Sequence, residues 1–86
     1  MSNEAGYHVR TALGWLEVGA PDGAKESLSK ALTLVDDEAT KGLISDAMRL
    51  CSSANPRAAD AAVKKIIAHE RAQKVAGMLA DVGGAE

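Results

Sequence analysis

The chain has 86 residues, of which 47% are hydrophobic and 26% are charged, and its net charge is −2. This length suits one small globular domain, because two domains would each be too small to bury a sufficient core. No apolar run approaches the roughly 18 residues that cross a bilayer, the N-terminal segment does not resemble a signal peptide, and the single cysteine, Cys51, excludes an intramolecular disulfide. We therefore expect a soluble, cytoplasmic protein without a membrane partner.

The first half of the chain predicts two helices separated by one turn. Apolar residues at the spacing of a single buried helical face mark a helix over about residues 4–18, with Trp15 and Val18 beside that face. In the segment VGAPDGA, Gly19 suits a C-terminal cap, and Pro21 suits the first turn of a second helix over about residues 21–35. The predicted buried positions are Ala5, Val9, Ala12, Leu13, Leu16, Ala24, Leu28, Ala31, Leu32 and Val35.

The second half predicts two further helices, and no segment shows the alternation of a β-strand. A third helix is expected over about residues 38–54, with Asp36 or Asp37 as its N-cap, and Asn55 and Pro56 suit the start of a fourth over about residues 56–82. The third helix would bury Leu43, Ala47, Leu50, Cys51 and Ala54, with Ile44 and Met48 widening that face. Short loops favour antiparallel neighbours. The expected fold is an all-α bundle of four helices in a single domain over residues 1–86, with residues 1–3 and 83–86 frayed.

One segment of the first half resembles a hairpin of the tetratricopeptide family. In ALGWLEVGAPDGAKESLSKALTLVD, residues 12–36, Trp15 stands where the family places an aromatic, Gly19 fits its turn, and Ala24, Leu28 and Ala31 fit its packing positions. The resemblance covers under a third of the chain, lacks the closing proline and is not repeated, whereas such repeats need about three copies to build a core. It therefore describes how the hairpin packs. Membership of the family would imply binding of a peptide or protein.

The apolar stripe of the fourth helix is interrupted by the polar segment HERAQK, residues 69–74. The apolar residues before and after this break point in different directions at about 100° per residue. Two structures satisfy this pattern: one long helix whose halves contact different molecules, or a helix that bends or breaks near the polar segment. The two stripes are Ala59, Val63, Ile66 and Ile67, then Val75, Met78, Leu79 and Val82. Glu70 and Lys74 form a helical i, i+4 pair, so the break is also consistent with a solvated turn.

Catalytic and metal-binding chemistry receives no support from the residue pattern. A metal site needs three or four clustered ligands, and His8, Cys51 and His69 fall on three different predicted helices. Cys51 lies on a core stripe, where a small buried thiol is the ordinary expectation. We expect no enzyme activity, no metal and no cofactor.

Charge is distributed unevenly along the chain. Residues 1–40 carry three basic and seven acidic side chains, a net charge of −4, whereas residues 41–75 carry seven basic and three acidic ones, a net charge of +4. The basic half favours an acidic partner, or complementary pairing between two copies of the chain. Nucleic-acid binding through Arg57, Lys64 and Arg71, which recur every seven residues, is the alternative, although the sequence pI is about 5.6.

These observations together predict a small non-enzymatic protein-interaction module. Alanine dominates and phenylalanine is absent, so few large side chains are available for the core, which favours self-association as a homodimer. By analogy with small bacterial and phage regulators, such a module acts as an adaptor or a stoichiometric inhibitor. The expected partner-binding surface, with cations that steer the partner and apolar anchors, consists of Lys64, Lys65, His69, Arg71, Lys74, Val75 and Met78.

Overall fold

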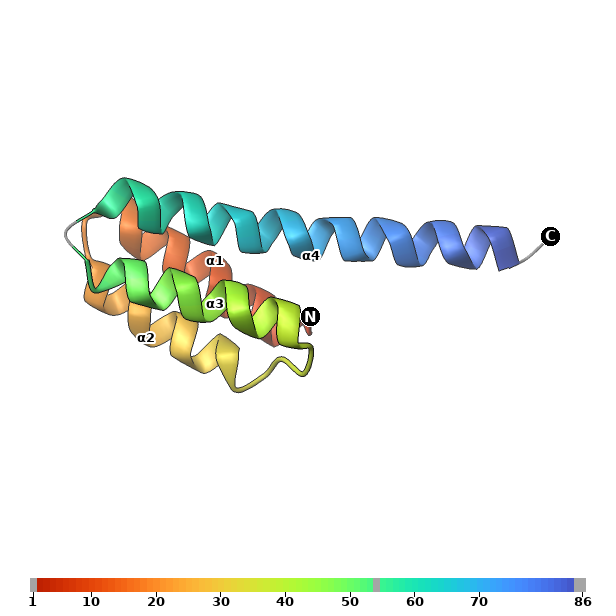
Figure 1. Ribbon diagram of the computed structural model, residues 1–86, viewed down its shortest axis with the longest axis horizontal. Helices are drawn as coiled ribbons and strands as arrows, with labels where there is room; N and C mark the ends of the chain where they lie inside the picture. The colour runs from red at the N-terminus through yellow and green to blue at the C-terminus, as the bar shows by residue number, and fades with distance from the viewer. Residues whose placement is uncertain (1, 54, 85–86) are drawn as a thin grey trace.

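Four antiparallel helices form a closed bundle in the computed structural model, which describes residues 2–53 and 55–84, with side chains described as far as Gly77. The helices are α1 (Asn3–Glu17), α2 (Pro21–Leu32), α3 (Glu38–Cys51) and α4 (Pro56–Gly84). Each helix packs on the next, and α4 returns to pack on α1 (Figure 1). Within the described ranges there is no strand. The predicted all-α bundle is thus confirmed.

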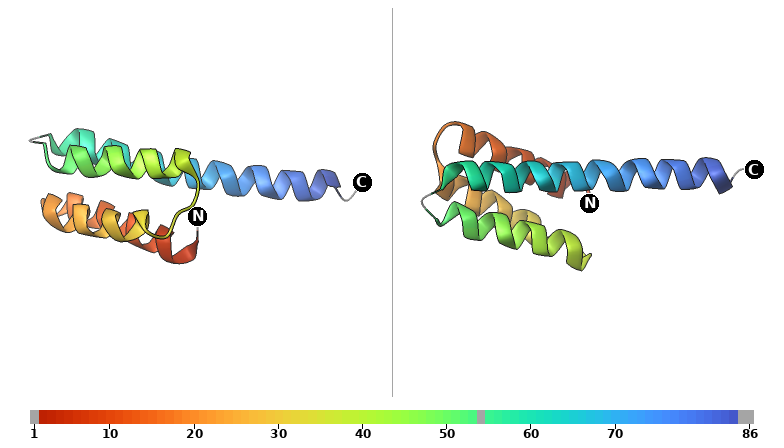
Figure 2. Two further views of the ribbon diagram at one scale, coloured as in Figure 1. Left: turned by 60° about the horizontal axis from the view of Figure 1, so that its bottom comes forward. Right: turned by 45° about the horizontal axis from the view of Figure 1, so that its top comes forward.

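Helix α4 is much longer than the bundle that it helps to build. It has 29 residues against 12 to 15 for the others, and at 1.5 Å per residue it is about 43 Å long. The molecule accordingly measures 51 × 22 × 19 Å, and the C-terminal part of α4 extends past the ends of the other helices (Figure 2). The helix is continuous through residues 69–74, so of the two structures that the interrupted stripe allowed, the unbroken helix is the one observed.

The turn between α1 and α2 depends on one glycine. Gly19 has a φ of 78°, in the left-handed region that side chains with a Cβ disfavour. Its N–H donates to the carbonyl of Leu16 at 3.1 Å, and the N–H of Ala20 donates to the carbonyl of Trp15 at 2.8 Å. These two bonds form a Schellman motif, which satisfies carbonyl groups at the helix end. The predicted role of Gly19 as a C-terminal cap is confirmed.

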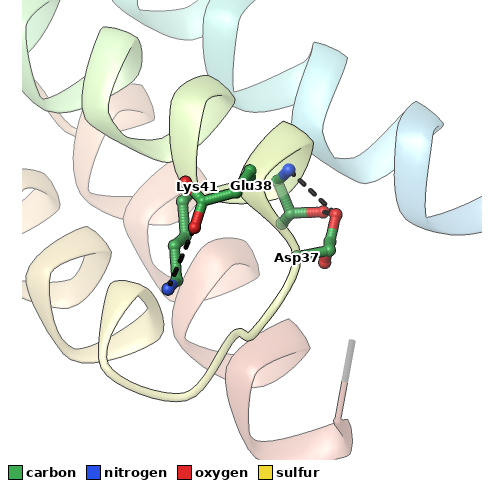
Figure 3. Close-up of polar contacts among 4 residues, drawn as sticks. Asp37, Glu38 and Lys41 are labelled. Carbon is green, nitrogen blue, oxygen red and sulfur yellow. Dashed lines mark hydrogen bonds and ion pairs between the residues drawn. The ribbon is translucent and has the colours of Figure 1, made fainter.

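Helices α3 and α4 both begin at side-chain caps. Asp37 accepts a hydrogen bond from the N–H of Thr40 at 3.0 Å and another from the Thr40 hydroxyl, beside the exposed ion pair of Glu38 and Lys41 at 3.7 Å (Figure 3). Asn55 accepts from the N–H of Ala58 at 3.2 Å, as predicted. The hydrogen bonds from the hydroxyl and N–H of Thr40 hold the pKa of Asp37 below its ordinary value of 3.8.

The core lies between all four helices and differs from the prediction mainly in α3. Ile44 and Ala47 are fully buried there, whereas Leu43 and Leu50 pack at the margin. Helices α2 and α3 also end three residues earlier than expected, at Leu32 and Cys51. The buried apolar residues are Ala5, Val9, Ala12, Leu16, Ala24, Leu28, Ala31, Val35, Ile44, Ala47, Cys51, Ala59, Val63 and Ile66.

Replacement of the turn glycine should destabilise the fold through the backbone alone. A Cβ built on Gly19 meets no atom within 4 Å, so Gly19→Ala introduces no steric clash. The alanine must still adopt the left-handed conformation, and this strain should lower the free energy of unfolding by about 1 kcal/mol. The matched control is Gly42→Ala in α3, which also meets open space and should stabilise the protein by about 0.5–1 kcal/mol. Urea denaturation measures both changes. Effects of the same sign in the two variants would contradict the conclusion that the turn requires the left-handed conformation of Gly19.

Acid should remove the stabilisation that Asp37 provides. Because the pKa of Asp37 is lowered in the folded protein, its ionised form favours folding above pH about 4, and this contribution is lost as the pH falls through the folded-state value. Asp37→Asn keeps a capping oxygen but does not titrate. We expect the stability difference between wild type and this variant at pH 6 to shrink at pH 2.5 in urea denaturation. A difference that is independent of pH would show that the charge of Asp37 is irrelevant.

Candidate protein-interaction surface on α4

The buried face of α4 continues one turn beyond its apolar residues. Ala59, Val63 and Ile66 are fully buried, and Glu70, at the next position of the same stripe, is only 3% exposed. The interpretation of residues 69–74 as a solvated turn is therefore wrong for Glu70. Every residue from 71 to 77 is exposed, so Glu70 marks the place where α4 leaves the bundle. We call residues 71–84 the free half of α4.

Glu70 is accommodated because α1 presents a glycine opposite it. A Cβ built on Gly6 would lie 3.1 Å from Oε1 of Glu70 and 3.3 Å from Nη1 of Arg10, so the carboxylate and the guanidinium both occupy the space above this bare Cα. The second cation is Lys74, whose Nζ lies 3.3 Å from Oε1 of Glu70. That oxygen has no partner with hydrogen-bond geometry among the described residues, so the carboxylate is held by charge and packing.

A small crevice opens where these charges meet. It has a volume of about 80 Å³ and is lined by Arg10 from α1 and by Ile67, Glu70, Arg71 and Lys74 from α4. Three cations and one carboxylate give this lining a net charge of +2. We call it the junction crevice, since it lies where α4 parts from α1.

The structure brings together three of the seven predicted site residues. Arg71 and Lys74 line the junction crevice, and Val75 lies one residue further along the free half with 48% of its surface exposed. Met78 falls outside the described side chains. The remaining three residues lie outside the crevice lining.

The other three predicted residues occupy different environments. Lys64 donates to Asp60, with Nζ and Oδ2 2.9 Å apart, and this hydrogen bond and the attraction of the carboxylate raise the pKa of Lys64. Lys65 lines a separate groove between α3 and α4. His69 is half-buried, and its Nε2 atom is buried without a hydrogen-bond partner in the described part of the chain. Of these three, only Lys64 forms an ion pair with another described residue.

Two residues of the junction crevice region were missed by the sequence analysis. Gly6 and Arg10 belong to α1, some sixty positions before Glu70. Nothing in the sequence pairs them with α4, since their role arises only when the first and last helices pack together. A glycine one turn before an arginine was the only local signal, and a glycine within a helix ordinarily indicates only a weak point.

Both aromatic residues of the chain lie on a second surface, the outer groove between α1 and α2. Tyr7 is 63% exposed and Trp15 is 44% exposed, and both line a groove of about 300 Å³. Trp15 packs directly against Gly23, since a Cβ built on Gly23 would lie 2.6 Å from a ring carbon of Trp15. The predicted hairpin of α1 and α2 is thus present, with Trp15 on its outer side.

Comparison with known proteins gives no indication of function, so the junction crevice and the free half of α4 are the main evidence. No family model, no curated protein and no solved structure matches the chain. Among the described residues, no three His, Cys, Asp or Glu side chains are grouped so as to hold a metal ion. No helix in the part of the chain that the structure describes is long and apolar enough to span a membrane.

Loss of the Lys74 charge should destabilise the fold more than loss of a lysine whose carboxylate partner is exposed. Lys74→Gln leaves the buried Glu70 carboxylate without its nearest cation, and we expect a loss of about 1 kcal/mol of unfolding free energy at low salt. The control is Lys41→Gln, whose partner Glu38 is almost fully exposed, and which should change stability by less than about 0.5 kcal/mol. Equal effects in urea denaturation would mean that burial of Glu70 does not depend on Lys74.

Proposed function

We propose that the protein is an interaction module that binds another protein through the junction crevice and the free half of α4, and that it does so as a homodimer. The observation that carries the proposal is the extension of α4 beyond the bundle with an exposed apolar residue, Val75, next to two cations, Arg71 and Lys74. Apolar contacts beside charged groups are a usual composition of protein-binding surfaces.

Helix stability gives an independent reason for a partner. The free half has 14 residues, its described side chains at 71–77 are all exposed, and it extends past the bundle (Figure 2). Isolated helices of about 12–15 residues are marginal in water, because tertiary packing supplies most of the stability of a protein helix. A partner that covers the free half would supply this packing, and the apolar residues of its sequence give the partner a surface to bury.

The charge of the surface indicates how a partner would be selected. Exposed cations along α4 would accelerate the approach of an acidic protein and disfavour a basic one. An adaptor or a stoichiometric inhibitor needs no more than such a surface. Nucleic acid is the alternative ligand, but Lys64, the middle residue of the basic row from Arg57 to Arg71, is already paired with Asp60.

Self-association is tested by light scattering over a dilution series into the high micromolar range. Wild type should shift from dimer to monomer on dilution, and Val75→Asp should remain monomeric with unchanged helicity by circular dichroism, because an exposed site tolerates the charge in the monomer but not in an interface. The control is Val18→Asp, which alters an even more exposed valine outside the free half and should dimerise normally.

A wild-type protein that is monomeric throughout this range would contradict the dimer. Binding of random duplex DNA by the protein at about 50 mM salt, where phosphate contacts are strongest, would favour the nucleic-acid alternative instead.

A further inference from the structure

The junction crevice has the features of a site for a single small anion. Three cationic side chains from two helices surround a volume of about 80 Å³, which is the space of two to three water molecules. Within the described residues, neither Arg10 nor Arg71 has a carboxylate at ion-pair distance, so two guanidinium groups beside the crevice remain available. Guanidinium groups bind planar oxyanions through paired hydrogen bonds.

Glu70 gives the crevice a fixed architecture rather than a loose gathering of surface cations. Its side chain is 4% exposed, it holds Lys74 at 3.3 Å, and it shares the space above Gly6 with Arg10. Because α1 provides Arg10 and α4 provides the rest of the lining, the site exists only when the two helices are packed together. The geometry therefore depends on the packing of α1 against α4, and the free half contributes Arg71 and Lys74 to it.

We propose that the junction crevice binds one carboxylate, supplied by an aspartate or glutamate side chain of a partner protein; this inference rests on the function proposed above. A monoanion is favoured over a dianionic phosphate because Glu70 already occupies the base of the site and repels added negative charge. The small volume admits a carboxylate group and little else. The neighbouring exposed Val75 favours a partner segment in which the acidic residue stands beside an apolar one.

The carboxylate site is tested by nuclear magnetic resonance with sodium acetate as the probe. The Nε–Hε signals of Arg10 and Arg71 should shift saturably with acetate at millimolar concentrations, and sodium chloride at equal ionic strength should give no saturable shift. Arg10→Gln should weaken acetate binding by about tenfold, on the scale of one lost charged hydrogen bond. Arg57→Gln is the control, because Arg57 is exposed at the opposite end of α4 and lies outside the crevice lining.

Three results would overturn the inference. They are the absence of a saturable shift, an equal loss of binding in the two variants, and tighter binding of inorganic phosphate than of acetate. The class of partner is tested with two peptides, acetyl-Leu-Glu-Leu-amide and acetyl-Leu-Gln-Leu-amide. The glutamate peptide should bind at least about fivefold more tightly than the glutamine peptide. Equal affinity would show that the carboxylate does not contribute to recognition.

The acetate experiment and the dimer experiment test different claims, and either can fail without the other. Oligomeric state and acetate binding are both measured on the wild-type protein, so acetate binding is recorded whether or not the protein dimerises. Acetate binding in a monomeric protein would support the carboxylate site and contradict the homodimer. A dimer that does not bind acetate would leave the proposed module in place and refute this inference.

Discussion

The rest of the molecule depends on the packing of four helices against one another at buried alanines. Each helix contributes at least one alanine that is fully buried, including Ala12, Ala24, Ala47 and Ala59. An alanine has no side chain beyond Cβ, so backbones can pack closely, and the few larger apolar residues then suffice to fill the remaining space. A core of this kind is narrow. It ends where the alanines and their larger neighbours end, whereas α4 continues, and this difference in length creates the free half.

The sequence was sufficient to predict what depends on local rules. Four helices, their order, the Gly19 turn and the Asn55 cap follow from periodicity and from residues with strong backbone preferences. The centre of the α3 core was misplaced because two overlapping apolar stripes were available, and only packing against α2 and α4 selects Ile44 over Leu43. The choice between Asp36 and Asp37 likewise required the position of Thr40.

The candidate site was predicted only where it lies on one helix. Arg71, Lys74 and Val75 could be chosen from α4 alone, but the burial of Glu70 could not. A glutamate at the end of an apolar stripe is ordinarily a solvent-exposed residue. What reverses that expectation is the missing Cβ of Gly6, on a helix that is distant in sequence. Lys65 and His69 were grouped with these residues by nearness along the chain, although a helix turns such neighbours onto different sides. Lys64 shares the side of Arg71 but lies two turns earlier, where it pairs with Asp60.

The environment of Cys51 has a practical consequence for studying α4. Its thiol is only 5% exposed, and burial raises its pKa, so little of the reactive thiolate forms at neutral pH. A second cysteine introduced on the exposed surface of α4 would consequently react with maleimide or nitroxide reagents far faster than the native one. Spectroscopic labels can thus be attached along the free half without removing Cys51 from the core, and distances between labels on two molecules would reveal how any pair of α4 helices is oriented.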